Sequence, residues 1–278
     1  MDHDDKPIGR ILNRREVLAL LGGAGAVVLA GRLPNLAFAQ TPAEETVPGC
    51  IVRPEQTEGP FFVEERLGRS DLRPESASGD PKPGVPLALT FRVFGIGEGC
   101  APLEGAVVDV WHCDAQGDYS GVSDRTGGFD TVEQTWLRGF QRTDADGVAR
   151  FTTVYPGWYP GRAVHIHFKV RTGVTASEYE FTSQLYFDDA LSDRVFEDTA
   201  YVREGFRDTL NANDFIFAGG GNSLLLEPTE TAEGYAASFD IGLDLSSAGA
   251  GDTDPDREYP GGPSFPPPPR GPSGGSSG

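Results

Sequence analysis

The sequence predicts an all-β fold, a β-sandwich of mostly antiparallel strands with long loops and few short helices. Short strand-like apolar runs recur between residues 85 and 245, and turn-forming residues separate them. Gly contributes 37 and Pro 22 of the 278 residues, which suits one loop-rich domain better than two. Few segments carry the 3.6-residue period of an amphipathic helix.

The charge balance limits the classes of partner. Asp and Glu number 42 against 23 Lys and Arg, a formal net charge of -19. Such acidity argues against nucleic acid and against an anionic membrane surface as partners. Beyond that it indicates only solubility.

Residues 1–39 are typical of a Tat export signal rather than of a folded element. The twin arginine Arg14-Arg15 precedes an apolar, Gly-rich stretch at 17–31, and a small-x-small pattern ends at Ala39. A membrane anchor is the alternative, but this stretch is shorter than the roughly 20 residues that span a bilayer. We therefore expect cleavage after Ala39, no membrane span in the mature form, and a periplasmic or secreted protein.

The folded domain is predicted to occupy residues 40–245. Residues 54–62 contain too much Pro and Gly for the interior of a helix or strand, and this composition predicts an extended segment that lies over the domain. Strand-like runs follow at 85–94 and 106–112, with turn material at 95–105 between them.

The second half continues the same pattern. Asp144-Ala145-Asp146-Gly147 predicts a turn into a strand, and a calcium loop is disfavoured because its later ligands are missing. The remaining expected elements are strands at 148–154, 164–171 and 181–187, a short helix at 191–199, and apolar runs at 224–226 and 235–245. Residues 246–278 are Pro-rich, then Gly/Ser-rich, and are predicted to be disordered.

Three cysteines, Cys50, Cys100 and Cys113, would meet an oxidising compartment after export, where two can pair. An extended strand between Cys100 and Cys113 would hold their Cα atoms well beyond the ~7 Å limit for a disulfide. This favours Cys50 as a member of any bridge. No C-x-x-C spacing suggests metal binding by thiolates.

The chemistry of the chain concentrates in the strand predicted at 164–171, where apolar and polar side chains alternate. A half-buried strand of this period places His165 and His167 on one face, ~6 to 7 Å apart along the strand, near enough to share a metal ion. Surface histidines, a zinc or copper hydrolase, and a cupin-like site are the alternatives. No carboxylate follows closely enough for a cupin or a two-His-one-carboxylate iron site.

Five segments follow one another in a recognisable order: TEGPFF at 57–62, VVDVWHCDAQGDYSG at 107–121, DGVARFTTVYPGWYP at 146–160, GRAVHIHF at 161–168 and SQLYF at 183–187. Together they resemble the intradiol ring-cleavage dioxygenases, the family of catechol and protocatechuate 3,4-dioxygenases. The resemblance covers roughly residues 50 to 190, and the shared order makes it more specific than any single motif.

The resemblance implies that one non-haem Fe(III) is held by four side chains: Tyr119, Tyr159, His165 and His167. A phenol has a pKa of ~10, so it becomes an anionic ligand at neutral pH only beside a strong Lewis acid. Tyr155 is the rival for the second phenolate. Tyr159 is preferred because it follows the Pro-Gly turn, as the ligand does in the family, whereas Tyr155 closes a strand.

The implied reaction opens a small aromatic diol between its two hydroxyl-bearing carbons with O2. By the same resemblance Tyr159 also acts as base, Arg162 stabilises charge that develops on the substrate, and Gln184 is a polar residue behind the site. For Arg162 the alternative is a solvated loop charge. Trp111 and His112 are expected to be packed scaffold rather than ligands.

Two departures from the family pattern matter. The connection from Tyr159 to His165 spans six positions, shorter than in familiar members, which predicts an open site. No long helical segment of the dimerising kind precedes the sandwich, so the oligomeric state stays open. Two other functions remain: a secreted β-sandwich binding module without catalytic iron, and a zinc or copper enzyme that uses the histidine pair.

Overall fold

The computed structural model describes residues 51–96, 99–124, 128–172 and 179–245. The predicted export signal, the predicted disordered tail and Cys50 lie outside these ranges. The described strands are β1 (Pro86–Gly95), β2 (Ala101–Pro102), β3 (Val107–Trp111), β4 (Ser123–Asp124), β5 (Phe129–Asp130), β6 (Arg138–Arg142), β7 (Val148–Val154), β8 (His165–Arg171), β9 (Glu180–Tyr186), β10 (Thr229–Glu230) and β11 (Tyr235–Leu243).

Helical structure is sparse in the described residues. The helix α2 (Asp189–Val195) is followed by short 3-10 helices at η2 (Thr199–Tyr201), η3 (Asn211–Asn213), η4 (Phe217–Gly219) and η5 (Gly221–Leu224). The Asp188 side chain caps α2 by accepting a hydrogen bond from the backbone N–H of Leu191. The all-β prediction is confirmed, and the predicted short helix begins two residues early and ends four residues early. None of the described helices is long and apolar enough to cross a membrane.

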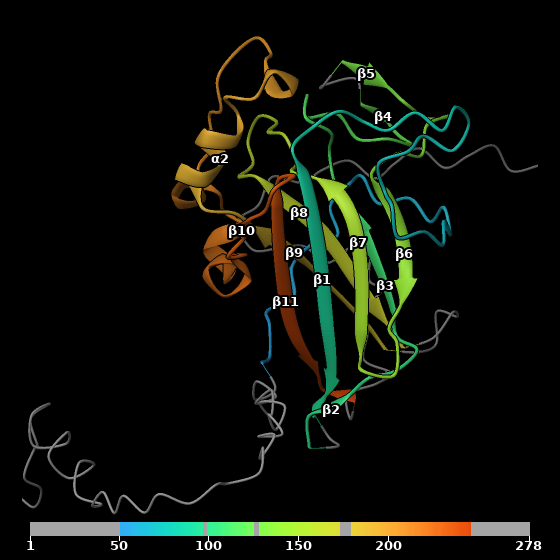
Figure 1. The fold of residues 1–278 in the computed structure, drawn as a ribbon. Coiled ribbons are helices and arrows are strands. Elements are labelled where there is room, and N and C mark those ends of the chain that lie inside the picture. The colour runs from blue at the N-terminus through green and yellow to red at the C-terminus, as the bar shows by residue number, and fades with distance from the viewer. Residues whose placement is uncertain (1–50, 97–98, 125–127, 173–178, 246–278) are drawn as a thin grey trace, which may run out of the picture. The chain divides into compact units, whose positions relative to one another are not determined.

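Two sheets build the sandwich. One has the antiparallel order β6-β3-β8-β9, and the other runs β10-β11-β1, with β7 and β2 both pairing β1. The pair β1 and β11 is parallel and joins segments far apart in sequence, with Leu87 opposite Tyr235. Figure 1 shows β1 and β11 side by side in the nearer layer, with β8 and β9 behind them.

The core lies between the sheets and fixes the orientation of β8. The ring centroids of Phe91 on β1 and Phe168 on β8 lie 5.3 Å apart, and Phe239 on β11 lies 5.5 Å from Phe168. Burying a Phe side chain contributes roughly 1.5 to 3 kcal/mol. Because Ile166 and Phe168 face this core, the histidines that alternate with them face the opposite side of the sheet.

The prediction of a half-buried β8 is wrong. His165 is 2% and His167 1% exposed, so both faces of the strand are covered at this end. The cover is the extended segment predicted at 54–62, which Gln56 ties to β9 by donating its backbone N–H to the Thr182 carbonyl. The Ser183 hydroxyl donates to the Pro54 carbonyl as well. Alternation in the sequence thus reports the two faces of the strand, not their exposure.

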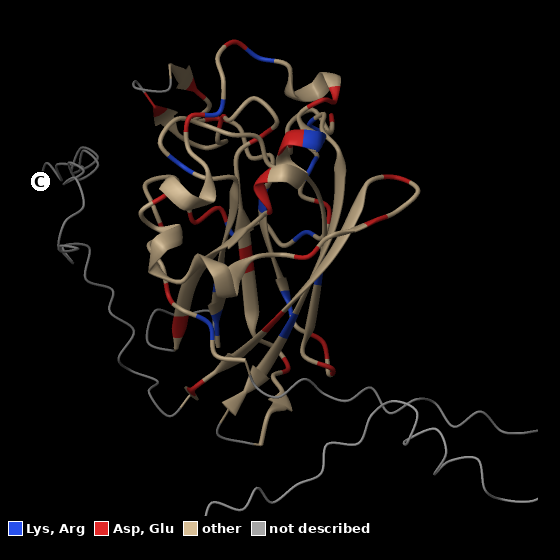
Figure 2. Ribbon diagram, turned by 90° about the vertical axis from the view of Figure 1, so that its left-hand side faces the viewer, with Lys and Arg blue, Asp and Glu red and all other residues tan. Residues whose placement is uncertain are grey.

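Two smaller predictions can be checked in the described residues. Asp144 begins a turn in which its carboxylate accepts from the N–H groups of Asp146 and Val148, and Gly147 has φ +73°, as the turn reading requires. Cys100 is disulfide-bonded and Cys113 is a buried free thiol, so these two are not bridged to each other. Figure 2 shows acidic residues spread over loops, strands and a helix, consistent with the strongly negative net charge.

Candidate active site

The two histidines of β8 converge on one point. Their Nε2 atoms lie 3.0 Å apart and their ring planes meet at 79°. The Nδ1 atom of His165 lies 2.7 Å from the Ala163 carbonyl oxygen, so Nδ1 carries the proton and donates it. The Nε2 lone pair of His165 is therefore free to bind a metal ion.

Two phenols join the histidines. The Tyr159 hydroxyl lies 3.1 Å from Nε2 of His165. Tyr119 comes from the loop after β3, and its ring centroid lies 5.7 Å from that of Tyr159 and 6.2 Å from that of His167. Phe61 of the covering segment stacks on Tyr119 with centroids 4.5 Å apart, which fixes the plane of the phenol. The sandwich thus brings together all four side chains that the sequence singled out.

Burial dominates the electrostatics of this group. It lowers the pKa of His165 and of His167 well below the ordinary value, so both imidazoles are neutral. Burial also raises the pKa of Tyr119 well above its usual range and that of Tyr159 to about 12. The phenols therefore stay protonated unless a cation is bound beside them.

The residues present fit a metal ion with mixed nitrogen and phenolate ligands. The Tyr119 hydroxyl is buried and has no hydrogen-bond partner among the described residues, as expected of an atom whose partner is a metal ion. Within the same ranges, no three His, Cys, Asp or Glu side chains gather closely enough to hold a metal. An ion at this histidine pair would therefore use the phenolic oxygens rather than a carboxylate.

Arg162 and Gln184 are also part of the site. The Nη2 atom of Arg162 donates to Oε1 of Gln184 over 2.5 Å, and Nη1 lies 3.4 Å from Nε2 of His165. The Arg162 side chain is only 12% exposed, so the reading as a solvated loop charge is wrong. Nε2 of Gln184 donates to the Thr57 carbonyl, which links the pair to the covering segment.

Comparison with known proteins assigns the chain to a family. The family model described as "Dioxygenase" matches residues 57–244. The chain belongs to the intradiol ring-cleavage dioxygenase family. Among solved structures, an intradiol ring-cleavage dioxygenase from Tetranychus urticae is 26% identical, with a TM-score of 0.61 over 70% of this chain and 96% of that one.

Relatives of this chain in sequence are also named as dioxygenases. The protocatechuate 3,4-dioxygenase beta chain of Burkholderia cepacia is 29% identical over 66% of this chain and 76% of its own length. Catechol 1,2-dioxygenase 1 of Acinetobacter lwoffii is 28% identical over 54% of this chain and 50% of its own. The chain thus spans three quarters of the first relative and half of the second.

The side chains next to the site motifs behave as the sequence predicted for scaffold. Both ring nitrogens of His112 are bonded, to the Cys113 carbonyl and to the Thr153 hydroxyl, each over 2.7 Å. The Tyr155 hydroxyl lies 2.8 Å from the Ser192 hydroxyl and takes no part in the site. Trp111 stacks on His167 with centroids 5.0 Å apart and planes within 8°, so it packs against a candidate ligand without being one.

Three residues to which the sequence assigned no role complete the surroundings: Asp214, Tyr186 and Gln56. Asp214 forms an ion pair with Arg162, with 2.8 Å between its Oδ2 and the arginine Nε. The Tyr186 hydroxyl lies within hydrogen-bond distance of Gln56 and of Gln184. The pairing of β8 with β9 brings Tyr186 here, the return of the chain after α2 brings Asp214, and the covering segment brings Gln56. Tyr186 lies in the SQLYF motif, which was the one available signal.

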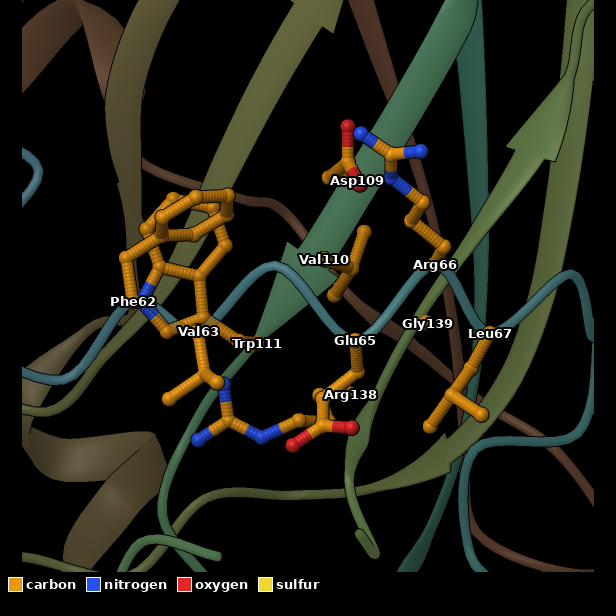
Figure 3. A pocket seen from close by; sticks show the side chains of 10 residues that line it. All are labelled: Phe62, Val63, Glu65, Arg66, Leu67, Asp109, Val110, Trp111, Arg138 and Gly139. Carbon is orange, nitrogen blue, oxygen red and sulfur yellow. The ribbon is translucent and has the colours of Figure 1, made fainter. Parts of the chain in front are cut away.

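A hollow lies on the same outer face, away from the four candidate ligands. Trp111 and Phe62 stand at one end of it and Leu67 and Gly139 at the other, as Figure 3 shows. None of the predicted site residues lines it. Trp111 borders this hollow and also stacks on His167, so the indole ring is a wall shared by both.

Proposed function

We propose that this family member is a non-haem Fe(III) dioxygenase that cleaves small aromatic diols between the two hydroxyl-bearing carbons with O2. Tyr119, Tyr159, His165 and His167 would hold the iron. The observation that carries the proposal is the convergence of two neutral imidazoles and two phenols, one of whose buried hydroxyls has no partner among the described residues.

Each residue of the site has a part that follows from its position. Bound ferric iron would supply the positive charge that makes both phenols anionic and draws electron density from a catechol. Tyr159 is the partly exposed member of the four, and its hydroxyl oxygen is placed to accept a proton from a substrate hydroxyl. The Arg162 guanidinium, beside His165, stabilises negative charge that develops on the opening ring.

The breadth of substrates follows from the loop between the candidate ligands. Only six positions separate Tyr159 from His165, a connection that leaves little chain to wall off the pocket. We therefore expect 4-substituted catechols and 1,2,4-trihydroxybenzene to be accepted alongside catechol. A protein that turns over catechol but none of the substituted rings would contradict this expectation.

Export by the Tat pathway is a further part of the proposal. Its basis is the twin arginine ahead of a weakly hydrophobic, Gly-rich stretch. A Tat substrate crosses the membrane folded, so iron could be loaded before export. Replacing Arg14 and Arg15 by Lys should abolish processing at Ala39, and unchanged appearance of the mature form would rule the route out.

The metal content of the purified protein tests the proposed function. We expect about one iron per chain and a burgundy to red-brown colour, because tyrosinate-to-Fe(III) charge transfer absorbs visible light. A colourless protein that stays iron-free after reconstitution would favour the secreted binding module. Stoichiometric zinc or copper in place of iron would favour the hydrolase alternative.

A further inference from the structure

We propose that Asp214 is a positioning residue that aims the Arg162 guanidinium at the active site, an inference that rests on the proposed function. Asp214 precedes η4 and lies 52 positions after Arg162. It is outside every segment whose motif indicated the site.

The Asp214 carboxylate is immobilised by four hydrogen bonds. Its Oδ2 accepts from Nε of Arg162 and from the backbone N–H of Ala163, both over 2.8 Å. Its Oδ1 accepts from the backbone N–H groups of Ile216 and Phe217, over 2.7 and 3.0 Å. The side chain is fully buried at 0% exposure, so water does not compete for these bonds. The carboxylate is therefore a fixed reference point for Arg162.

A fixed carboxylate determines where the rest of the guanidinium points. The group is planar, so anchoring Nε on Asp214 and Nη2 on Gln184 leaves no freedom for Nη1. Nη1 is then the nitrogen that lies 3.4 Å from Nε2 of His165. A free arginine side chain would lose rotamer entropy on adopting one geometry. Because Asp214 holds Arg162 in one geometry in the folded protein, this entropy is lost on folding and not during the reaction.

The pair also sets the electrostatic character of the site. Asp214 compensates the charge of Arg162, so the two together add no net charge to a buried pocket. What remains is a directional N–H donor at Nη1. Such a donor stabilises charge where it forms during the reaction, without a general attraction for any anion.

Asp214 also has an architectural part, because it caps the turn at Ile216 and Phe217. The substitution Asp214→Asn separates the two parts. An Asn side chain keeps an oxygen that can accept from Ile216 and Phe217, but its NH2 group would face Arg162 Nε and the Ala163 N–H, which are themselves donors. The arginine side of the contact is lost while the turn keeps its acceptor.

The test is a double-mutant cycle of Asp214→Asn and Arg162→Gln in the iron-loaded protein, with catechol turnover as the first readout. Asp214→Asn should lower kcat about 100-fold and change KM far less, because it withdraws a donor that acts on developing charge. When Arg162 is already replaced by Gln, Asp214→Asn should lower kcat further by less than about 2-fold, because both substitutions remove the same N–H donor. Multiplicative losses, or full kcat in Asp214→Asn, would overturn the inference.

Asp109→Asn is the matched control. It breaks another largely buried aspartate–arginine pair, with 2.7 Å between Asp109 Oδ2 and Arg171 Nη2 and side chains 14% and 18% exposed. Its kcat should stay within about 2-fold of the parent, and an equal fall would mean that any broken pair of this kind slows the enzyme. If Asp214→Asn does not fold, Asp214→Glu replaces it in the cycle, because the extra methylene moves the carboxylate from the position that anchors Arg162 Nε, and the coupling should have the same sign.

Anaerobic binding of 4-nitrocatechol, followed by its absorbance, separates this inference from the proposed function. If the parent protein binds the probe but turns over no catechol, the proposed function fails and the cycle is scored on binding. Asp214→Asn and Arg162→Gln should then shift the spectrum of the bound probe alike. Unlike shifts would overturn the role of Asp214, and a parent that binds no probe would overturn both claims.

Discussion

The two faces of β8 are buried almost equally and are stabilised in different ways. Ile166 and Phe168 on the inner face are each 0% exposed, and His165 and His167 on the outer face are 2% and 1% exposed. Apolar side chains need only contact area, which the opposite sheet supplies. A buried polar atom needs a specific partner, and among the described residues two atoms at this face lack one: Nδ1 of His167 and the hydroxyl of the neighbouring Tyr119.

The partners of the outer face come from distant parts of the chain. Lys169, next along that face, lies 2.5 Å from a Glu58 oxygen and 2.7 Å from a Glu180 oxygen. Its ammonium also lies 4.2 Å from the centre of the Phe62 ring. The inner face thus depends on a sheet that any apolar sequence of the right period could build. The outer face depends on particular side chains of the segment at 54–62 and of β9.

The largest effect should come from removing a candidate ligand on the outer face. His167→Ala and Tyr119→Phe should each abolish stoichiometric iron binding and the visible absorption, while leaving the far-ultraviolet circular dichroism unchanged. Tyr155→Phe is the control, because that hydroxyl is bonded to Ser192. Iron retained at full stoichiometry by either ligand variant would contradict the assignment, as would loss of iron in the control.

An inner-face substitution should instead act on stability. Phe168→Ala is expected to lower the free energy of unfolding by roughly 3 to 5 kcal/mol, because it opens a cavity among Phe91, Phe181 and Phe239. Urea unfolding followed by fluorescence measures the change, and the folded fraction should still bind iron. A cost below about 1 kcal/mol would mean that the sandwich does not rely on this contact.

His112 offers a comparison with the two site histidines, since its ring is buried but fully bonded. Burial lowers its pKa from 6.5 to about 4, so the unfolded chain binds more protons than the folded chain between these values. Stability should therefore fall as the pH drops from about 6.5 to about 4, by roughly 3 kcal/mol in all. His112→Gln should remove that part of the pH dependence and keep the iron. An identical pH profile in the variant would refute the assignment.

The smallest effect is expected at the edge of the outer face. Lys169→Met keeps the length of the side chain and removes its charge. The two glutamates left behind are 40% and 32% exposed and can be hydrated, so the loss of stability should be about 1 kcal/mol. Thermal unfolding measures it, with Arg150→Met at the exposed pair with Asp144 as a control that should change less. If the control lost as much stability as Lys169→Met, the ion pairs of Lys169 with Glu58 and Glu180 would be no stronger than an ordinary surface pair.

The sequence was informative where local pattern determines structure. The turn at 144–147 located β7 to the residue, and alternation placed His165 and His167 on one face. The motif order singled out Tyr119 and Tyr159, which the structure brings beside them. It missed β6, whose residues Arg138–Arg142 show no apolar alternation. It also missed the parallel pairing of β1 with β11, because register between distant segments is decided by packing.

The same limit explains what was missed at the site. Asp214 becomes a neighbour of Arg162, and Gln56 a neighbour of Tyr186, only after the chain has closed on itself, and neither Asp214 nor Gln56 stands in a catalytic motif. The burial of β8 was misjudged for a related reason. Nothing in the period of a strand tells whether a remote segment, here residues 54–62, will cover its polar face.

The central claim is ring opening between the two hydroxyl-bearing carbons, and the position of oxygen in the product tests it most directly. Iron-loaded protein should be given catechol under ¹⁸O2 and the product identified by mass spectrometry. The account predicts a muconate that carries both labelled oxygen atoms, and Tyr159→Phe should form it much more slowly. A semialdehyde from cleavage beside the diol, a muconate without label, or no turnover by an iron-replete protein would contradict it.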